Sequence, residues 1–321
     1  MAHQISGQLD FADSFVTNND KLNQRLNKID RLIDWNAFEK KMSSVYASST
    51  GRPSYPLLIL FKSLLLQAWY NLSDYALEES LDDRLSFRRF VGLSNSKKSP
   101  DHSVFSRFRR QLAKLKIYDE LFEELNRQLE KLGLIIKKGT LVDATVIEAA
   151  PKKPNQNPDG SAGKSPVDKD ADWTKKGGKY IFGYKAHVAV DVESELIRSA
   201  IATPAGVCDS KMLEAVIKGD EKWVYADKIY DTGMNAELLK NKAIENGIMI
   251  NGGGRGILPE LERYCNRFLA KIRYPVERIF GTLKRTYQHR RARYVGLAKN
   301  DLHLKILSMA YNLRKVEKLC A

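Results

Sequence analysis

Several classes of protein are excluded by what this sequence has little of. It contains three cysteines, Cys208, Cys265 and Cys320, which are far apart and in no metal-ligand spacing, so we expect a reducing cytosol and no disulfide framework. The longest apolar run, residues 57–69, is interrupted by Lys62 and is shorter than the roughly 20 residues that a membrane span needs. We therefore expect a buried helix there and no membrane association. The N-terminus lacks a basic stretch followed by an apolar run, so a secretion signal is not expected.

Acidic residues are fewer than basic residues, and most of this difference lies near the C-terminal end of the sequence. The chain has 53 Lys and Arg against 39 Asp and Glu, a formal net charge of +14, and residues 252–321 alone hold 16 Lys or Arg against 5 Asp or Glu. Such a surface binds polyanions with salt-sensitive affinity, because each phosphate contact releases counterions. A basic surface that only keeps the protein in solution is the alternative.

Length and pattern predict two domains preceded by a short segment. The chain has 321 residues, 43% hydrophobic and 29% charged, as in ordinary globular proteins. Residues 1–50 carry apolar positions at a spacing near 3.6, which predicts one amphipathic helix. Residues 51–135 carry helical patterns with good helix starts at Ser73-Asp74 and Pro100-Asp101, so they are predicted to form an all-helical domain. The remainder, residues 136–321, has a different pattern.

From Gly139 onwards, short segments rich in Val, Ile and Thr predict strands. Residues 151–179, rich in Pro, Asn, Gly, Ser and Lys, are interpreted as a long solvated loop. A three-strand meander followed by alternating helices and strands is the order of the ribonuclease H-like fold. The predicted fold is therefore α+β and multidomain, with an all-helical N-terminal domain followed by a ribonuclease H-like α/β domain. The expected strands are residues 140–147, 180–192, 196–203, 223–227 and 247–251, and the expected helices residues 209–218, 234–246 and 258–285.

Three carboxylates stand at informative positions in this order. Asp143 lies in an apolar segment that is typical of a central strand, where an unpaired carboxylate would cost several kcal/mol, so it needs a partner such as a metal ion. Asp227 follows a strand at its carboxyl end, where open α/β sheets place ligand sites. Glu277 lies in the long helical region, with Arg273 and Lys284 on the same helical face.

Three carboxylates can bind two Mg²⁺ ions, or Mn²⁺ as a substitute, for an in-line displacement at phosphorus. The structural alternative is that Asp143 caps a turn, Asp227 caps the next helix and Glu277 pairs with Arg273. Pro275 leaves two possibilities for the helix, because it either kinks the helix or starts a new one.

Basic side chains are candidates for DNA contacts on two segments. On the helix predicted after Asp101 they form one face, and after Glu277 they are interleaved with Tyr287 and Tyr294, although exposed charged faces are often only solvated. The candidate DNA-binding residues are Arg107, Arg109, Arg110, Arg273, Lys284, Arg285, Arg290, Arg291 and Arg293.

Four other side chains have simpler interpretations. Trp173 either stacks on a displaced base or, as we expect, anchors the loop. His187 is expected to be a surface or hydrogen-bonded residue. Asp209 and Asp231 are expected to cap turns.

In this order the motifs resemble those of the DDE transposases of bacterial insertion sequences, specifically the insertion-sequence-five group of the broader insertion-sequence-four-like superfamily. The most specific is Arg-x3-Glu-x6-Lys, met by Arg273, Glu277 and Lys284. The chain departs from the family pattern at Ile229, where Gly is expected, at Ala270, where Tyr is frequent, and at Cys208, where His is common. The other motifs are Gly51-Arg52-Pro53-Ser54-Tyr55-Pro56, Leu72-Ser73-Asp74, Ser86-Phe87-Arg88-Arg89-Phe90, Pro100-Asp101-His102-Ser103, Val142-Asp143-Ala144-Thr145, Gly183-Tyr184-Lys185-Ala186-His187, Thr203-Pro204-Ala205 and Ala226-Asp227-Lys228.

The resemblance implies a function and a set of partners. It implies catalytic, metal-ligating carboxylates at Asp143, Asp227 and Glu277, and a helical domain that recognises DNA. The expected activity is metal-dependent cleavage at the ends of an insertion sequence, followed by 3′-hydroxyl strand transfer into target DNA. The expected partner is double-stranded DNA, bound by a homodimer or larger assembly at the nucleoid in the bacterial cytoplasm. The alternatives are a transposase-derived DNA-binding protein without activity and another ribonuclease H-like nuclease.

Overall fold

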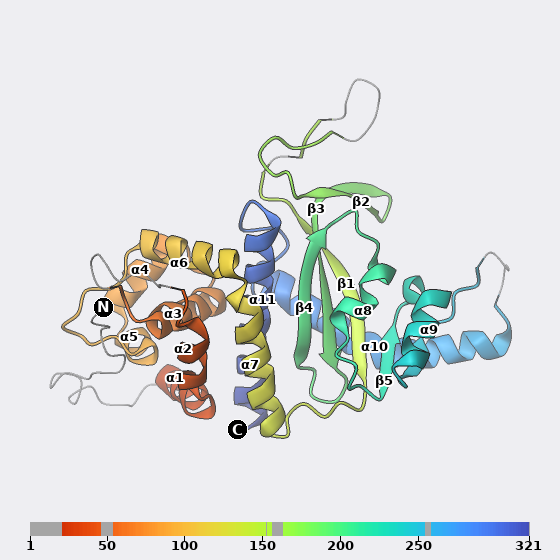
Figure 1. The fold of residues 1–321 in the computed structure, drawn as a ribbon, viewed down its shortest axis with the longest axis horizontal. Helices are drawn as coiled ribbons and strands as arrows, with labels where there is room; N and C mark the ends of the chain where they lie inside the picture. Colours follow the sequence, from red (N-terminus) through yellow and green to blue (C-terminus); the bar gives the residue numbers. More distant parts are fainter. Residues whose placement is uncertain (1–20, 46–53, 152, 156–162, 254–257, 321) are drawn as a thin grey trace. The chain divides into compact units, whose positions relative to one another are not determined.

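A computed structural model describes residues 21–45, 54–151, 153–155, 163–253 and 258–320 (Figure 1). The chain divides into two compact units, one of Met1–Lys131 with Lys305–Ala321 and the other of Leu132–Leu304. The Gly51-Arg52-Pro53 motif and much of the predicted 1–50 segment lie outside the described residues. Within the described residues, no helix is long and apolar enough to cross a membrane.

The first unit is helical throughout its described residues and has one almost fully buried helix, α3 (Leu57–Tyr70). Residues 58–69 of α3 are buried, which confirms the helix predicted from the longest apolar run. The helix ends at Asn71, whose left-handed φ of 52° closes the last turn. The other helices are α1 (Lys21–Leu32), α2 (Trp35–Met42), α4 (Asp74–Asp83), α5 (Leu85–Val91), α6 (His102–Leu115) and α7 (Ile117–Lys131).

Short polar side chains set the helix starts. Ser73 accepts a hydrogen bond from the Ala76 N–H and starts α4, and Asp101 caps α6, as the sequence predicted. The single helix predicted within residues 1–50 is wrong, because the chain forms α1 and α2 there. Asp34 separates the two, since its carboxylate accepts from the Asn36 N–H and begins a new helix.

The last helix, α11 (Leu297–Leu319), ends in the helical unit. From Lys305 onwards it packs there: the Trp69 indole N–H donates to the Ala310 carbonyl at 2.8 Å, and Lys305 pairs with Asp119 at 2.6 Å. This division differs from the predicted 136–321 domain over residues 305–321. The reason is the apolar face of the helix, whose side chains complete the core of the first unit.

The second unit is built on a mixed sheet that has six strands in the described residues. Adjacent strands follow the order β4-β3-β1-β5-β6, with β2 pairing with the first part of β3. The pairs β1–β3, β3–β4 and β2–β3 are antiparallel, whereas β1–β5 and β5–β6 are parallel. The strands are β1 (Thr140–Glu148), β2 (Asp172–Lys176), β3 (Lys179–Asp191), β4 (Ile197–Pro204), β5 (Trp223–Ala226) and β6 (Glu245–Ile248).

All five predicted strands are present, but the predicted loop 151–179 is corrected by β2. Gly177 and Gly178, with φ of 56° and 78°, make a two-residue turn that pairs Lys176 with Lys179. The helix predicted at 209–218 is only a 3₁₀ turn, η2 (Asp209–Met212), followed by α8 (Leu213–Val216). The next helix, α9 (Gly233–Asn241), is shorter than predicted, because β6 already begins at Glu245.

Helices cover both faces of this sheet (Figure 1). Val142 and Ala226 share a buried apolar cluster with residues of α8 and α9, such as Leu213 and Leu239. Successive strand residues point to opposite faces, so Asp143 points to the other side. That side is occupied by α10 (Glu260–Arg285), which contacts β1 and β5.

Candidate active site

Asp143 and Asp227 come together on adjacent parallel strands. The β1–β5 register pairs Thr140 with Val224 and Leu141 with Tyr225, and its continuation brings Asp143 opposite Asp227. Asp143 lies inside β1, at the level where β5 ends, and its side chain is 22% exposed. Asp227 directly follows β5 and its side chain is 39% exposed. Asp227 also accepts a hydrogen bond from the Lys228 N–H and caps the 3₁₀ turn η3 (Lys228–Tyr230). The capping role that the structural alternative gave to Asp227 is therefore present as well.

Arg273 of α10 links the two carboxylates. Its Nη2 lies 3.2 Å from Asp143 Oδ2, and its Nη1 lies 3.9 Å from Asp227 Oδ1. The helix α10 runs without interruption through Pro275, so this proline does not start a new helix. Arg273 pairs with the aspartates and not, among the described residues, with Glu277. One guanidinium therefore faces two carboxylates and balances one of their two negative charges.

The electrostatics of Asp143 show why a cation is needed. Burial raises the pKa of this carboxyl, and the negative charge of Asp227 raises the pKa further. The guanidinium of Arg273 and the Ala144 N–H, which donates to Asp143 at 2.7 Å, oppose that pKa shift. Two ionised carboxylates in this position are stable only beside positive charge.

Glu277 is exposed and lies one helical turn after Arg273 on α10. In the part of the chain that the structure describes, no three His, Cys, Asp or Glu side chains are grouped closely enough to hold a metal ion. The structure thus brings Asp143 and Asp227 together with Arg273, and leaves Glu277 beside this group. The two aspartates provide hard oxygen donors of the kind that Mg²⁺ and Mn²⁺ bind.

Other cations gather around Lys284, three helical turns after Arg273 on α10. Lys284 is half-buried on α10, and its pKa is lowered first by burial and then by the charges of Lys176 and Arg290. Arg285 and Arg290 are exposed. The position of these residues fits a phosphate-binding surface, whose role in DNA binding stays a prediction.

Two further arginines after α10 have local partners. Arg291 donates from Nε to the Ala149 carbonyl at 3.2 Å and also donates to the Ala150 carbonyl, so it tethers the chain after β1. The guanidinium of Arg293 lies 6.0 Å from the centroid of the Tyr294 ring.

The predicted basic face of α6 is only partly correct. Arg107 and Arg110 are exposed, but Arg109 is buried, with 7% of its surface exposed. Its guanidinium pairs with Asp74 and donates to Gln67, so it is a structural ion pair and not a free cation for DNA.

The remaining side chains have local structural roles. The Trp173 indole N–H donates to the Gly163 carbonyl at 2.9 Å, which confirms a loop anchor. His187 is buried and bonds Thr203 at 2.8 Å. Asp209 pairs with Lys185 at 2.9 Å, and Asp231 accepts from the Asn251 N–H at 2.7 Å.

Two residues near the site were missed by the sequence interpretation. Lys176 lies at the end of β2, and its charge acts on both Asp143 and Lys284. The Gly177-Gly178 pair between segments of strand-forming residues is a hairpin signal that could have located it. The buried hydroxyl of Tyr230 has no hydrogen-bond partner among the described residues, and burial together with nearby aspartates raises its pKa.

Comparison with known families matches both halves of the chain. Residues 12–111 match a family described as a transposase domain (DUF772), and residues 136–313 match the transposase DDE domain. The second match alone covers more than half of the chain. The chain belongs to the DDE transposase family.

The chain is also similar to a solved transposase structure. It is a cryo-EM structure of a piggyBac transposase synaptic complex with hairpin DNA, at 12% identity and a TM-score of 0.33. The alignment covers 76% of the present chain and 51% of the piggyBac chain, so the present chain spans about half the length of that transposase.

The structure accounts for one departure of this transposase from the family pattern. Ile229 lies in η3, is 51% exposed and is not among the described residues with positive φ, so its position does not require glycine. Ala270 is exposed on α10, and Cys208 contacts Ser210 at 3.2 Å.

Proposed function

We propose that this DDE transposase belongs to the insertion-sequence-five group, cuts DNA at the ends of its element and joins the freed 3′-hydroxyl to target DNA. The observation that carries the proposal is the pairing of Asp143 with Asp227 across two parallel strands, with Arg273 between them. A half-buried pair of carboxylates on adjacent strands is costly to the fold, and such costs are retained at sites that bind cations.

The sheet supports assignment of the predicted 136–321 domain, up to residue 304, to a ribonuclease H-like catalytic domain, while residues 305–321 pack in the helical unit. Three antiparallel strands, β1, β3 and β4, are followed by β5 and β6, which run parallel to β1. That arrangement is the one expected of the fold, and the acids lie on its first and fourth core strands. We assign residues 51–135 to a helical DNA-recognition domain and residues 1–50 to a helical segment preceding it.

The carboxylates of Asp143, Asp227 and Glu277 would hold Mg²⁺, or Mn²⁺ as a substitute. When bound, the metal activates the attacking hydroxyl and stabilises the leaving oxygen of a displacement at phosphorus. When DNA and metal are absent, Arg273 balances part of the negative charge of the aspartates. Its guanidinium would be free to bind a phosphate once a metal held these carboxylates. Lys284 holds a second phosphate from the same helix.

The basic side chains would bind double-stranded DNA. Those of the helical unit contact duplex away from the cut, and those after Glu277 contact phosphates near it. Cutting both ends of one element requires at least a homodimer on DNA, acting at the bacterial nucleoid. The proposed contacts are made by Arg107, Arg110, Arg285, Arg290 and Arg293. Arg291 is proposed to contact DNA as well, in addition to holding the chain after β1.

The test is cleavage of a labelled duplex carrying the element end, with Mg²⁺ and with Mn²⁺. The native chain is compared with Asp143→Asn, Asp227→Asn and Glu277→Gln, and with Glu237→Gln, which removes an exposed carboxylate on α9. We expect the three site variants to bind DNA and not to cut, and Glu237→Gln to cut like the native chain.

Other outcomes select other functions. Binding without cutting by the native chain, with either metal, would leave a transposase-derived DNA-binding protein. Cutting that ignores the end sequence would favour a general ribonuclease H-like nuclease. Cutting that survives all three site substitutions would move the active site elsewhere.

A further inference from the structure

The β2–β3 hairpin has an exposed, basic tip. Residues 175–180 are all exposed, and they include Lys175, Lys176 and Lys179 but no acid. The two turn glycines have positive φ, and a Cβ on either would meet nothing within 4 Å. Glycine is needed there for the backbone turn and not for close packing, so the tip projects into open space.

These lysines lack a directly paired acid within the described residues. None of the three forms an ion pair with a described side chain, and Lys175 instead lies 5.5 Å from the centroid of the exposed Tyr180 ring. The tip contributes little to the apolar core. A two-stranded extension that buries little is kept for its surface.

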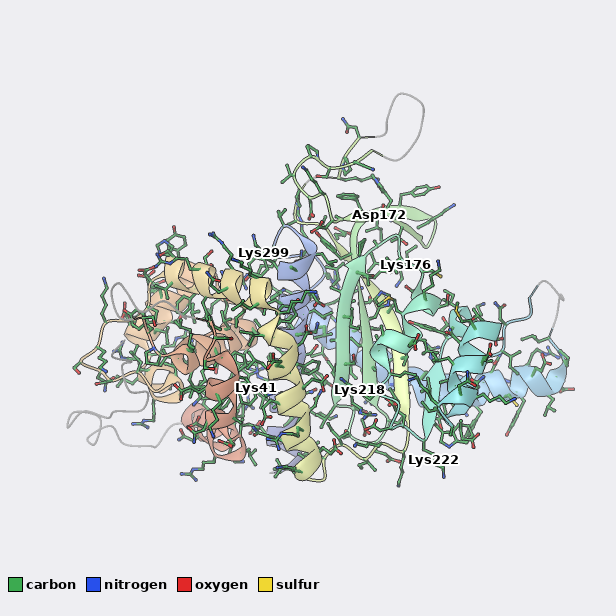
Figure 2. All side chains as sticks on the ribbon, viewed as in Figure 1. Lys41, Asp172, Lys176, Lys218, Lys222 and Lys299 are labelled. Atoms are coloured by element: carbon green, nitrogen blue, oxygen red, sulfur yellow. The ribbon has the colours of Figure 1, made fainter. Side chains whose placement is uncertain are left out.

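The strand register places the tip at the end of the sheet where β1 finishes, because Lys176 pairs with Lys179 at the start of β3 and Gly183 of β3 pairs with Glu148. The charge of Lys176 acts on Asp143 and on Lys284, and the charge of Arg290 also acts on Lys284. The backbone of Arg290 is fixed next to the end of β1, because its carbonyl accepts from the Glu148 N–H at 3.0 Å. Figure 2 shows Lys176 at the hairpin end of the sheet, and Lys218 and Lys222 at the opposite end.

Gathering like charges in this way is unfavourable in the free protein. Lys176 and Arg290 each repel Lys284, and Glu148 is the acid that opposes this repulsion. A polyanion removes the repulsion and releases counterions when it binds. Cations that only improved solubility would be spread over the surface, whereas here Lys176 and Arg290 lie close enough to the half-buried Lys284 to lower its pKa.

We propose that the tip of the β2–β3 hairpin, through Lys175, Lys176 and Lys179, binds backbone phosphates of duplex DNA next to the bond that is cut. This inference rests on the proposed function and adds a DNA-binding element to it. The contacts are to phosphates and carry no base readout, so they act on any duplex sequence.

The test measures binding of the full chain to two labelled duplexes, one with the element end and one unrelated, over a range of salt concentrations. The triple variant Lys175→Ala, Lys176→Ala, Lys179→Ala is compared with Lys222→Ala, Lys240→Ala, Lys242→Ala, which removes the same charge from exposed lysines elsewhere in the unit. A third chain carries Lys175→Arg, Lys176→Arg, Lys179→Arg. Thermal melting of each chain checks folding.

We expect the hairpin alanine variant to bind both duplexes about tenfold or more weakly, with the slope of log Kd against log salt reduced by up to about 3. The control and the arginine variant should bind like the native chain. Ethylation of single phosphates next to the cut should weaken the native chain and not the hairpin alanine variant.

The inference fails if the hairpin and control alanine variants bind with the same Kd and slope. In that case metal-dependent cutting by the native chain would still support the proposed function. If the native chain bound neither duplex, both proposals would fall.

Discussion

Arg273 places one positive charge where two negative charges meet, and this determines how the site behaves before it binds anything. Its side chain is 12% exposed, and its guanidinium lies within 4 Å of Asp143 and Asp227. A metal ion that binds the same two carboxylates must compete with Arg273. The residue therefore stabilises the metal-free fold and weakens its affinity for metal at the same time.

We predict that Arg273→Ala destabilises the metal-free protein by about 1 to 2 kcal/mol, because two half-buried carboxylates lose their counter-charge. Mg²⁺ should then raise the unfolding free energy of the variant more than that of the native chain. Urea unfolding with and without Mg²⁺ measures both effects.

The matched control is Arg278→Ala, on the same helix, whose side chain is 56% exposed and pairs with Glu195. The control should change stability by about 0.5 kcal/mol or less, with no extra response to Mg²⁺. Equal responses of all three chains would contradict the prediction.

His187 makes stability depend on pH. Burial lowers its pKa to about 4, so between about pH 6.5 and pH 4 the unfolded chain binds a proton that the folded chain does not. The unfolding free energy should therefore fall as the pH is lowered through this window, by on the order of 3 kcal/mol from this residue. His187→Gln can keep a hydrogen bond to Thr203 and should lose less stability over the same window. Unfolding curves at several pH values test this, and an unchanged pH dependence in the variant would assign the effect to other groups.

At the level of single residues, the sequence predicts which side chains belong to a site better than it predicts what each side chain contacts. Asp143 and Asp227 could be selected because strand patterns and strand ends are local features. The burial of Arg109 could not be predicted, since it depends on Asp74, which is 35 residues away in the chain. The position of Arg273 between two aspartates likewise depends on how α10 crosses the sheet.

Among the elements, the β2–β3 hairpin depends on its two glycines. We predict that Gly177→Ala and Gly178→Ala each cost about 1 kcal/mol, because alanine is strained at positive φ. DNA affinity should fall although no charge changes. Gly233→Ala is the control, since that glycine starts α9 with open space and without positive φ. Chemical unfolding and DNA binding measure the two effects, and an alanine at 177 or 178 that behaves like the control would show that the turn is not required.

The elements that the sequence predicts well have strong local patterns. The β1, β3 and β4 strands and the α3 and α6 helices lie close to their expected bounds. The errors have local causes too. The short strand β2 was hidden by the polar composition around it, and the helix expected at 209–218 is reduced because η2 and its ion pair to Lys185 take up the first turn.

For the whole molecule, we predict that the helical unit depends on the end of the chain. Truncation after Leu304 removes the buried side chains Leu307, Ala310, Leu313 and Val316, together with the Lys305–Asp119 pair. The loss should cost several kcal/mol and expose the helical unit to proteolysis, while residues 132–304 stay protected. Truncation after Lys318 should be tolerated, because Leu319 is 49% exposed. Limited proteolysis with mass spectrometry distinguishes the two, and a protease-resistant helical unit in the shorter chain would contradict the prediction.

The division at Lys305 could not be predicted from the sequence pattern. A long amphipathic helix shows which face is buried but not which unit it is buried in. The basic excess near the C-terminus gave no indication either, because charge describes the surface of α11 and not its core-facing side.

The placement of α11 also sets an order of events during synthesis. Residues 57–131 leave the ribosome first, but the helix segment that completes their core follows only after the 132–304 unit has been made. At about 5 to 20 residues per second, that interval is on the order of 10 to 30 s. During it the nascent helices expose apolar surface that the later segment will cover. A polypeptide whose translation stops before residue 305 therefore carries a sheet unit beside a helical unit whose core is incomplete.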